Sequence, residues 1–511
     1  MIKKNDILTG MVQSFGSDGE GVLRMEDYVF FVPYALPGEK ISFRVLKIQG
    51  KIGYGKVEEI FVSSPDRVSP VCPVFHTCGG CGLQHMSYAL QTKFKREKVK
   101  NALLKIGGAE AEVSPVVPCA SPYGYRNKLQ LPVGVDGNGN TVLGFYAERS
   151  HRIVPIDRCY IHPEWSAKLI AVFKEYLACS EAKGYDERAK KGLIRHLVAR
   201  EIDGKYLVTI VATEKNLPEK ELLIEKLQTA FPGCSAFVNV NKSDSNVIFG
   251  DRFYSLCGAE HIEGETDGIA YEAGAETFVQ VNPEIREKLY ERAMEACFAG
   301  GAEVVIDAYS GGGLMTAMAA RRAKRAYGIE LNAEASACAE SLKKKNNLAN
   351  MTNVCGDAAA ELPRIMAEEN GEKTVLILDP PRAGVARSVL YAILKSKIER
   401  FVMISCDPAT LARDLGILTG TLVEKDGVLI KNTAGARDNR ENNYFRIESV
   451  EPFDMFPQTK HVETLVVLSH KKPDSHLEVK IDFDNTALDK MAVSERAETR
   501  KPQEKTTYKN M

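Results

Sequence analysis

Hydrophobic and polar residues follow three patterns along this chain, and each pattern predicts a different kind of structure. Up to about residue 63, apolar and polar residues alternate between glycine-bearing turns, which predicts short strands and a small β-barrel. Alternation returns from Ser121 to about Ser255, interrupted by helices predicted from roughly Glu164 to Glu181 and from Glu219 to Ala230. From about Ala270 to Ser469, apolar strands alternate with helices, as in a parallel sheet covered by helices. The sequence therefore predicts a multidomain α/β protein.

Polar residues end five successive apolar strands of the predicted parallel sheet. The carboxyl ends of parallel strands meet at one edge, where open α/β sheets bind their ligands. A glycine turn at 311–313 follows the first strand, and Glu330 ends the next strand, 23 positions after Asp307. The turn lacks the G-x-G-x-x-G spacing, so the pattern favours a nucleoside-type site over a dinucleotide site. The five residues at strand ends are Asp307, Glu330, Asp357, Asp379 and Cys406.

The stretch FVMISCDPATLARD, from Phe401 to Asp414, contains a short apolar strand, a cysteine and a sharp exit at Asp-Pro. A lone cysteine is more often an inert, buried small side chain than a nucleophile. Beside a carboxylate and a nucleoside-type pocket, however, Cys406 suits one reaction. Its thiolate would add to carbon 6 of uracil so that carbon 5 attacks an electrophilic methyl group, and a base would then remove the carbon 5 proton. Glu463 is the candidate base, and Asp379 would orient the methyl donor or the base.

Four cysteines suggest an inorganic centre in the middle of the chain. The run C-x5-C-x2-C carries two glycines between its last two cysteines, and a further cysteine follows in DRCYIHPEW. In a chain without a secretion signal, such spacing argues for zinc or an iron–sulfur cluster, and spacing alone leaves both open. No redox motif accompanies it, so a loop-stapling role is expected. The four residues are Cys72, Cys78, Cys81 and Cys159.

Charge and hydropathy limit the partners that this chain can have. With 67 basic and 68 acidic residues among 511, the net charge is −1, so a nucleic-acid surface would have to be a local patch. The start of the chain lacks the apolar stretch of a signal peptide, and no apolar run is long enough to span a bilayer, so a cytoplasmic protein without a membrane partner is expected. Twelve cysteines are then expected to be reduced thiols, ligands or catalysts.

Three groups of polar residues are candidates for an RNA-facing patch. For the basic residues of the first group described below, an ordinary solvated strand face is an equally good explanation. For those of the second group, a solvated helix face is the better explanation. The first group lies on the predicted barrel, the second is the helical stretch from Lys93 to Lys100, and the third is embedded in central strands. The barrel residues are Lys40, Arg44, Lys47, Lys51 and Lys56, and the central residues are Arg126, Asn127, Lys128, Arg195 and His196.

The chain resembles the bacterial RNA uracil-5-methyltransferases, in particular the branch that modifies 23S ribosomal RNA, which is related to the tRNA uracil-54 enzymes. The resemblance covers residues 5 to 470, and its most specific part is SCDP followed by HVET. The other matching motifs are FVQVN at 278–282, DAYSGGG at 307–313, DPPRAG at 379–384, SCDPATLARD at 405–414 and DMFPQTKHVET at 454–464.

The resemblance implies a Rossmann-like methyltransferase domain that uses S-adenosylmethionine, with Cys406 as nucleophile and Glu463 as base. It also implies that a [4Fe-4S] cluster sits on the four cysteines and that the N-terminal barrel is an OB-like TRAM domain. Ser310 and Leu314 stand where relatives often have cysteine and asparagine, which puts a side-chain contact from position 314 in doubt. The cofactor-binding residues implied are Gln280, Tyr309, Glu330, Asp357 and Asp379.

The expected organisation has four parts: a TRAM-like barrel at 1–63, a β-rich iron–sulfur domain at 64–260, a methyltransferase domain at 261–470 and a charged tail at 471–511. A polar stretch at 424–444 is expected to leave the sheet. A monomer that binds 23S ribosomal RNA or transfer RNA, and not DNA, is expected. Two other functions remain open. An amino-group methyltransferase would not need Cys406, and a non-catalytic RNA-binding or assembly factor would bind RNA without transferring a methyl group.

Overall fold

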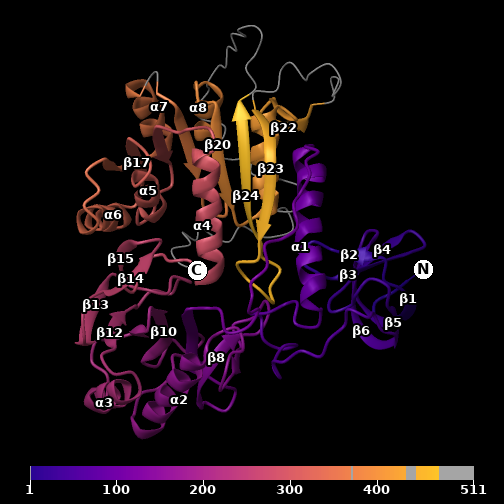
Figure 1. Ribbon diagram of the computed structural model, residues 1–511. Coiled ribbons are helices and arrows are strands. Elements are labelled where there is room, and N and C mark those ends of the chain that lie inside the picture. The colour runs from indigo at the N-terminus through magenta and orange to yellow at the C-terminus, as the bar shows by residue number, and fades with distance from the viewer. Residues whose placement is uncertain (1, 370–371, 433–444, 471–511) are drawn as a thin grey trace.

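The computed structural model describes residues 2–369, 372–432 and 445–470. Its longer strands form three sheets, which lie in three separate lobes (Figure 1). The predicted polar excursion begins as a hairpin of β21 (Leu422–Lys425) and β22 (Val428–Lys431). The rest of that excursion, from 433 to 444, and the predicted tail at 471–511 lie outside the described residues. Among the residues described, no helix is both long and apolar enough to cross a membrane.

The N-terminal sheet has six strands in the order β1-β5-β6-β4-β3-β2. Alternate side chains point inward, so that Leu23, Phe30 and Phe43 form a small buried core. Gly53 and Gly55 sit directly over the Phe30 and Phe43 rings, where an added Cβ would clash. The strands are β1 (Ile7–Met11), β2 (Ser14–Phe15), β3 (Gly21–Met25), β4 (Tyr28–Val32), β5 (Lys40–Gln49) and β6 (Ile52–Val62).

The central sheet has seven strands in the order β13-β12-β11-β10-β7-β8-β9. Helices α2 (Glu164–Cys179) and α3 (Lys220–Ala230) pack on one face through residues such as Phe173 and Leu223. Their bounds are close to those expected from the sequence. The strands are β7 (Lys128–Val135), β8 (Thr141–Tyr146), β9 (Ile153–Pro155), β10 (Ile194–Ile202), β11 (Lys205–Ala212), β12 (Ser235–Val240) and β13 (Arg252–Cys257).

The C-terminal sheet has the strand order β18-β17-β16-β19-β20-β24-β23, in which the first five strands are parallel and β24 is antiparallel to β20. A hairpin of β14 (Ile262–Thr266) and β15 (Ile269–Ala273) precedes it. The strands are β16 (Val304–Asp307), β17 (Arg325–Glu330), β18 (Met351–Cys355), β19 (Thr374–Leu378), β20 (Arg400–Ser405), β23 (Phe445–Phe453) and β24 (Glu463–His470).

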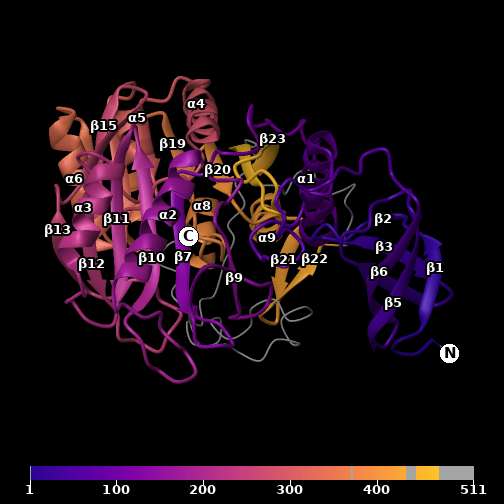
Figure 2. The same cartoon turned by 90° about the horizontal axis from the view of Figure 1, so that it is seen from below.

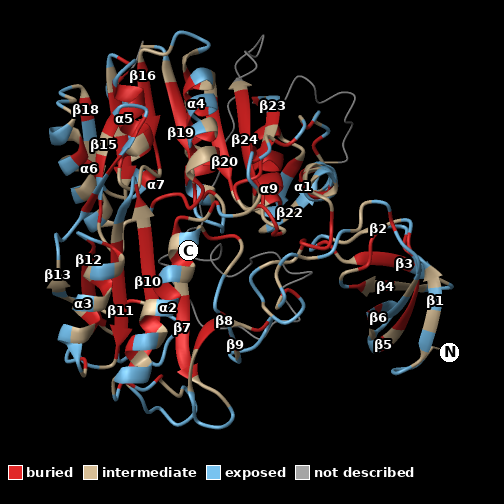
Figure 3. Ribbon diagram, turned by 60° about the horizontal axis from the view of Figure 1, so that its bottom comes forward, coloured by how far each residue is buried: buried red, intermediate tan, exposed pale blue. Residues whose placement is uncertain are grey.

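Helices cover both faces of this sheet, because alternate strand residues point to opposite sides. In β20, Val402 and Ile404 join the core beneath α4, α5 and α6, whereas Phe401 and Met403 join the core beneath α1, α7, α8 and α9. Strands of the two larger sheets are accordingly buried along much of their length (Figure 3). The helices are α4 (Pro283–Phe298), α5 (Leu314–Ala320), α6 (Ala333–Lys345), α7 (Ala358–Glu368), α8 (Arg387–Leu394) and α9 (Pro408–Thr419).

Helix α1 (Tyr88–Ala102) lies between the N-terminal lobe and the C-terminal sheet (Figures 1 and 2). Ser87 caps its start by accepting a hydrogen bond from the Leu90 backbone, and a π-helical turn at Leu103–Gly107 follows its end. On one side Phe94 contacts the edge of the Phe15 ring, with the centroids 5.3 Å apart. The helix therefore joins the N-terminal lobe to the strands that carry the candidate catalytic residues.

Several basic side chains that were candidates for an RNA-facing patch are buried, and the expectation is wrong for them. Lys95, within the predicted basic helix, has no exposed side-chain surface. Lys128 is 6% exposed, and its burial, with Arg200 and Arg126 nearby, lowers its pKa to about 7. Arg195 is 8% exposed and donates to the carbonyl oxygens of Asn241 and Ser243 at 3.1 and 2.6 Å. Asn127 and His196 are buried as well.

Candidate active site

Cys406 and Glu463 come together because β24 runs antiparallel to β20. Ser405, the last residue of β20, pairs with Thr464, so the residue after β20 faces the residue that begins β24. Cys406 is partly buried, and Glu463 is 4% exposed. Burial, followed by the negative charge of Glu463, raises the pKa of Cys406 to about 12. The ladder therefore places a thiol and a carboxyl within electrostatic reach of each other at the sheet edge.

Local sequence explains why the chain leaves β20 sharply after Cys406. Asp407 caps α9, because its carboxylate accepts hydrogen bonds from the backbones of Ala409 and Thr410 at 2.8 and 3.1 Å. Pro408 occupies the first helical position, where its missing N–H costs no hydrogen bond. The thiol thus stands between a strand end and a capped helix start.

Three carboxyls, two of them buried and that of Asp379 partly buried, form a connected acid cluster beside the thiol. Burial raises the pKa of Asp307 to about 7, and burial followed by the charge of Asp307 raises the pKa of Asp379 to about 7. Burial followed by the charge of Asp379 raises the pKa of Glu463 to about 8. Thr316 donates to one oxygen of Asp307 at 2.8 Å. The cluster can hold and release protons near neutral pH.

The glycine turn and Glu330 form a cradle near Asp307, whose pKa the charge of Glu330 helps to raise. Glu330 accepts hydrogen bonds from the backbones of Gly311 and Asn332 at 2.9 and 2.7 Å. Gly313 has a φ of +82°, and an added Cβ would lie 2.7 Å from the Ala339 side chain, so only glycine fits there. A Cβ at Gly311 or Gly312 would meet no atom within 4 Å. The space above the turn is open to a ligand.

The other residues implied as cofactor ligands lie around this cradle in different ways. Asp357 is exposed and caps α7, because it accepts a hydrogen bond from the Ala359 backbone at 2.9 Å. Tyr309 is partly buried, and burial is the main reason that its pKa is raised. Gln280 is 7% exposed and belongs to the segment between β15 and α4, outside the sheet. Its carbonyl oxygen accepts from the Asn127 side chain at 3.4 Å, which links the cradle to the central lobe.

Two residues of the site received no role from the sequence. Tyr290 of α4 is 7% exposed, and burial, followed by the charge of Asp379, raises its pKa. Because Tyr290 lies on the apolar face of an amphipathic helix, the sequence pattern indicated an ordinary core residue and not a residue of the site. Arg382 is exposed, and its positive charge opposes the rise in pKa at both Cys406 and Glu463. Its position directly after Asp379-Pro-Pro was the available signal.

The four cysteines are neighbours in the structure. Burial raises the pKa of Cys81 to about 12, and the charges of Cys78 and Cys72 contribute. Burial also raises the pKa of Cys159 to about 12, and the other three thiols contribute. The donor set expected for a cluster is therefore gathered in one region. Across the described ranges, no group of three or more histidines, cysteines and acids has an arrangement that could hold a metal ion.

The family model and the relatives found by comparison are all described as RNA methyltransferases. The family model described as tRNA (Uracil-5-)-methyltransferase matches residues 259–428. A relative from Halalkalibacterium halodurans, named an uncharacterized RNA methyltransferase, is 39% identical over 474 residues, covering 92% of this chain and 98% of the relative. A protein of the same description from Listeria innocua is 38% identical over 474 residues, covering 92% and 99%.

A solved structure shows the same architecture. The Pyrococcus abyssi tRNA (uracil-54, C5)-methyltransferase, in complex with S-adenosyl-L-homocysteine, superposes with a TM-score of 0.68 at 27% sequence identity. The similarity covers 90% of this chain and 100% of that one. The likeness therefore extends beyond the C-terminal sheet to the lobes that precede it.

Proposed function

This chain belongs to the RNA uracil-5-methyltransferase family, and on that premise we propose that it methylates carbon 5 of a specific uridine in RNA, with 23S ribosomal RNA as the substrate. The observation that carries the proposal is the meeting of Cys406 and Glu463 across the β20–β24 ladder. The four-cysteine motif favours the ribosomal branch. Transfer RNA is the alternative, since the similar enzyme from Pyrococcus abyssi is named for a tRNA position.

The chemistry follows from the two side chains. After the thiol proton has left to solvent, the Cys406 thiolate forms a bond to carbon 6 of the uracil, and the electron pair displaced from the carbon 5–carbon 6 double bond makes carbon 5 nucleophilic. S-adenosylmethionine, when bound, would supply the electrophilic methyl group and leave as S-adenosylhomocysteine. Glu463 then takes the proton from carbon 5, and the returning electron pair expels the thiolate. Folding raises the pKa of Glu463 to about 8, so the carboxyl must lose its own proton before it can act as the base near neutral pH.

The cradle beside the acid cluster fits the methyl donor. We assign the nucleoside part to the open space above Gly311 and Gly312, bordered by Glu330. Glu330 already accepts two backbone hydrogen bonds and keeps further acceptor capacity, which suits ribose hydroxyls. Gln280, Tyr309, Asp357 and Asp379 would complete the site.

The central lobe would carry a [4Fe-4S] cluster on Cys72, Cys78, Cys81 and Cys159, held in a structural role. The backbones of Gly82 and Leu83, directly after Cys81, both donate to the carbonyl oxygen of Gln458 at 3.0 Å. Gln458 lies five residues before Glu463. A centre that stiffens the cysteine loop would therefore also fix the segment that leads to the base.

A methyl-transfer assay tests the function and the substrate together. Purified protein, labelled S-adenosylmethionine and either 23S ribosomal RNA or transfer RNA should yield labelled 5-methyluridine in the ribosomal RNA only. With 5-fluorouridine in the RNA, carbon 5 carries no proton for Glu463 to remove, so a denaturation-stable protein–RNA adduct should accumulate. Cys406→Ala should abolish both products. Labelled transfer RNA would select the alternative substrate, and transfer that survives in Cys406→Ala would refute the covalent route.

A further inference from the structure

Three cations lie on one rim of the candidate active site. Arg382 is exposed, and its positive charge acts on both Cys406 and Glu463. The Lys98 ammonium of α1 donates to the carbonyl oxygen of Lys460 at 2.9 Å, which holds the two lysines together. Lys460 has 38% of its side chain exposed and lies three residues before Glu463. The rim is therefore assembled from α1, the turn after β19 and the segment before β24.

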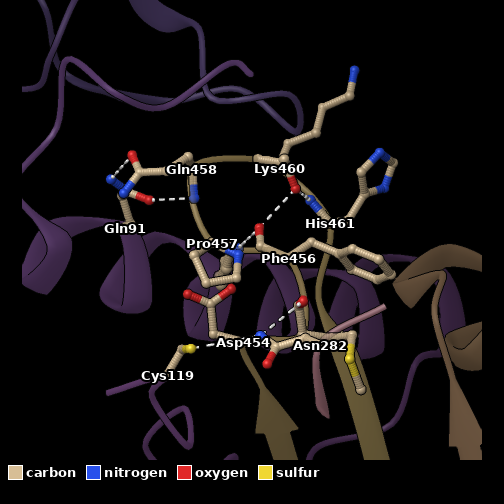
Figure 4. A network of polar contacts seen from close by, with 12 residues as sticks. Gln91, Cys119, Asn282, Asp454, Phe456, Pro457, Gln458, Lys460 and His461 are labelled. Carbon is tan, nitrogen blue, oxygen red and sulfur yellow. Dashed lines mark hydrogen bonds and ion pairs between the residues drawn. The ribbon is translucent and has the colours of Figure 1, made fainter. Parts of the chain in front are cut away.

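His461 stands among these cations. Its ring contacts the edge of the Phe456 ring, with the centroids 6.0 Å apart. Burial, followed by the positive charges of Arg382 and Lys98, lowers the pKa of His461 to about 4. The imidazole is thus neutral at pH 7 and adds no positive charge to the rim. In Figure 4 the side chains of Lys460 and His461 point away from the buried hydrogen-bond network that holds their backbone.

One acid of the N-terminal lobe reaches this rim. Asp18, in the turn between β2 and β3, forms an ion pair with Lys460 at 2.8 Å, and 41% of its side chain is exposed. Burial alone would raise the pKa of Asp18, but the hydrogen bond from Lys460 and the charges of Lys460 and Lys98 lower it below its ordinary value. The turn itself is seated on the protein, because Gly19 packs against Leu83 with a φ of +89°.

We propose that Arg382, Lys460 and Lys98 bind the RNA phosphates next to the target uridine, and that Asp18 takes the place of a phosphate on Lys460 in the free protein. This inference rests on the proposed function. An exposed lysine–carboxylate pair contributes about 0–1 kcal/mol, so a phosphate can replace the carboxylate at little cost. Lysine suits such an exchange, since its ammonium is a point charge on a flexible stem.

The position of the rim fits a requirement of the reaction. The target base must leave its stack for Cys406 to reach carbon 6, and unstacking costs a few kcal/mol. Phosphate contacts offset that cost most directly when they hold the backbone beside the extruded nucleotide. In a chain with a net charge of −1, long-range attraction cannot supply them. A cluster that includes Lys460, three positions before Glu463, and the arginine after Asp379-Pro-Pro can.

The test measures RNA affinity at several salt concentrations for Lys460→Gln and Lys174→Gln. Lys174 is the matched control, because its side chain is 37% exposed and pairs with Asp157 at 2.6 Å on the outer helix α2. Loss of one phosphate contact should weaken binding by Lys460→Gln severalfold and reduce the slope of log K against log salt by about 0.7 to 0.9. Lys174→Gln should match the wild type. Equal affinity and slope in the two variants would overturn the proposal.

A second pair of variants tests the exchange. Asp18→Asn should tighten RNA binding severalfold, and the gain should vanish when Lys460→Gln is also present. A gain that persists in the double variant would show that Asp18 acts only through general repulsion. Affinity for S-adenosylhomocysteine and melting temperature should stay at wild-type values in all variants. Wild-type protein that neither binds RNA nor transfers methyl groups would refute the proposed function, whereas active wild type with an unaffected Lys460→Gln variant would refute this inference alone.

Discussion

Lys95 and Asp454 form an ion pair 2.5 Å long, in which both side chains are fully buried, although 359 residues separate them in sequence. Lys95 also donates to the carbonyl oxygen of Phe456 at 3.0 Å. Nearby, the side chains of Gln91 and Gln458 join α1 to the same segment, at 3.0 Å. Helix α1 therefore fixes the stretch from Asp454 to Glu463 at its beginning and middle.

Replacing Lys95 with methionine should destabilise the protein by about 3–5 kcal/mol, because it leaves a carboxylate buried without its partner. Urea denaturation, followed by circular dichroism, measures the change in the free energy of unfolding. Lys93→Met is the control, since Lys93 is exposed on the same helix. The double variant Lys95→Met/Asp454→Leu should recover much of the loss. A single variant as stable as Lys93→Met would contradict the assigned role of the pair.

Glu463→Gln should separate the two halves of the reaction. Addition of Cys406 to carbon 6 and methyl transfer do not require the base, whereas removal of the carbon 5 proton does. A protein–RNA adduct carrying the labelled methyl group should therefore accumulate on unmodified RNA, with little free product. Denaturing gel electrophoresis after incubation with labelled cofactor detects it. Normal turnover by this variant would assign proton removal to another residue.

The same variant should be more stable than the wild type at alkaline pH. Folding raises the pKa of Glu463 to about 8, so between about pH 4.5 and 8 the folded state keeps a proton that the unfolded state has released. Stability therefore falls as the pH rises through this window, by an amount of the order of a few kcal/mol. Glutamine does not ionise, so Glu463→Gln should melt close to the wild type at pH 5 and clearly above it at pH 8. If the melting temperatures of Glu463→Gln and the wild type differ by the same amount at pH 5 and at pH 8, Glu463 is not a buried carboxyl that is protonated in the folded state.

Sequence reasoning predicted strand ends well and side-chain burial poorly. Asp307, Glu330 and Asp379 could be placed at one edge, because any parallel sheet brings the carboxyl ends of its strands together. Lys95 and Lys128 looked like surface cations, since lysine is almost never fully buried without a partner. The partner of Lys95 lies 359 residues away. No local pattern identifies a partner at that separation. Lys98 lies in the basic helix that was a candidate for RNA binding, but its grouping with Arg382 and Lys460 was not predicted, because the three gather only when α1 packs beside β23.

Anaerobically purified protein should contain iron and acid-labile sulfide, and Cys78→Ser should lose both. Loss of the centre should also lower methyl transfer, because the backbone after Cys81 holds Gln458. Cys179→Ser is the control, since that thiol is exposed on α2, outside the four-cysteine set. Metal and sulfide analysis of both variants gives the comparison. If the wild type contains zinc, the iron–sulfur assignment is wrong, although the centre could still staple the loop. If Cys78→Ser keeps its full metal content, Cys78 is not a ligand.

The N-terminal lobe should contribute to RNA affinity through lysines that form no ion pair with an acid among the residues that the structure describes. Arg44 and Lys51 already pair with Glu58 and Asp27, at 2.6 and 3.4 Å, whereas Lys47 and Lys56 are exposed on β5 and β6. Deleting residues 1–63 would be a poor test, because Leu36 packs with Leu83, Met86 and Phe94, and the cut would uncover that cluster.

Lys47→Gln/Lys56→Gln avoids this exposure of apolar side chains. If both lysines contact phosphates, the double variant should bind RNA more weakly and reduce the salt slope by about 0.7 to 0.9 for each lost contact. Affinity for S-adenosylhomocysteine should not change, since the cradle around Gly311 lies in the C-terminal sheet. Lys174→Gln/Lys226→Gln, on the outer helices α2 and α3, controls for the loss of two charges. If Lys47→Gln/Lys56→Gln leaves the slope of log K against log salt unchanged, these two lysines do not contact phosphates. Phosphate binding would then be assigned to the rim of the active site and not to the N-terminal lobe.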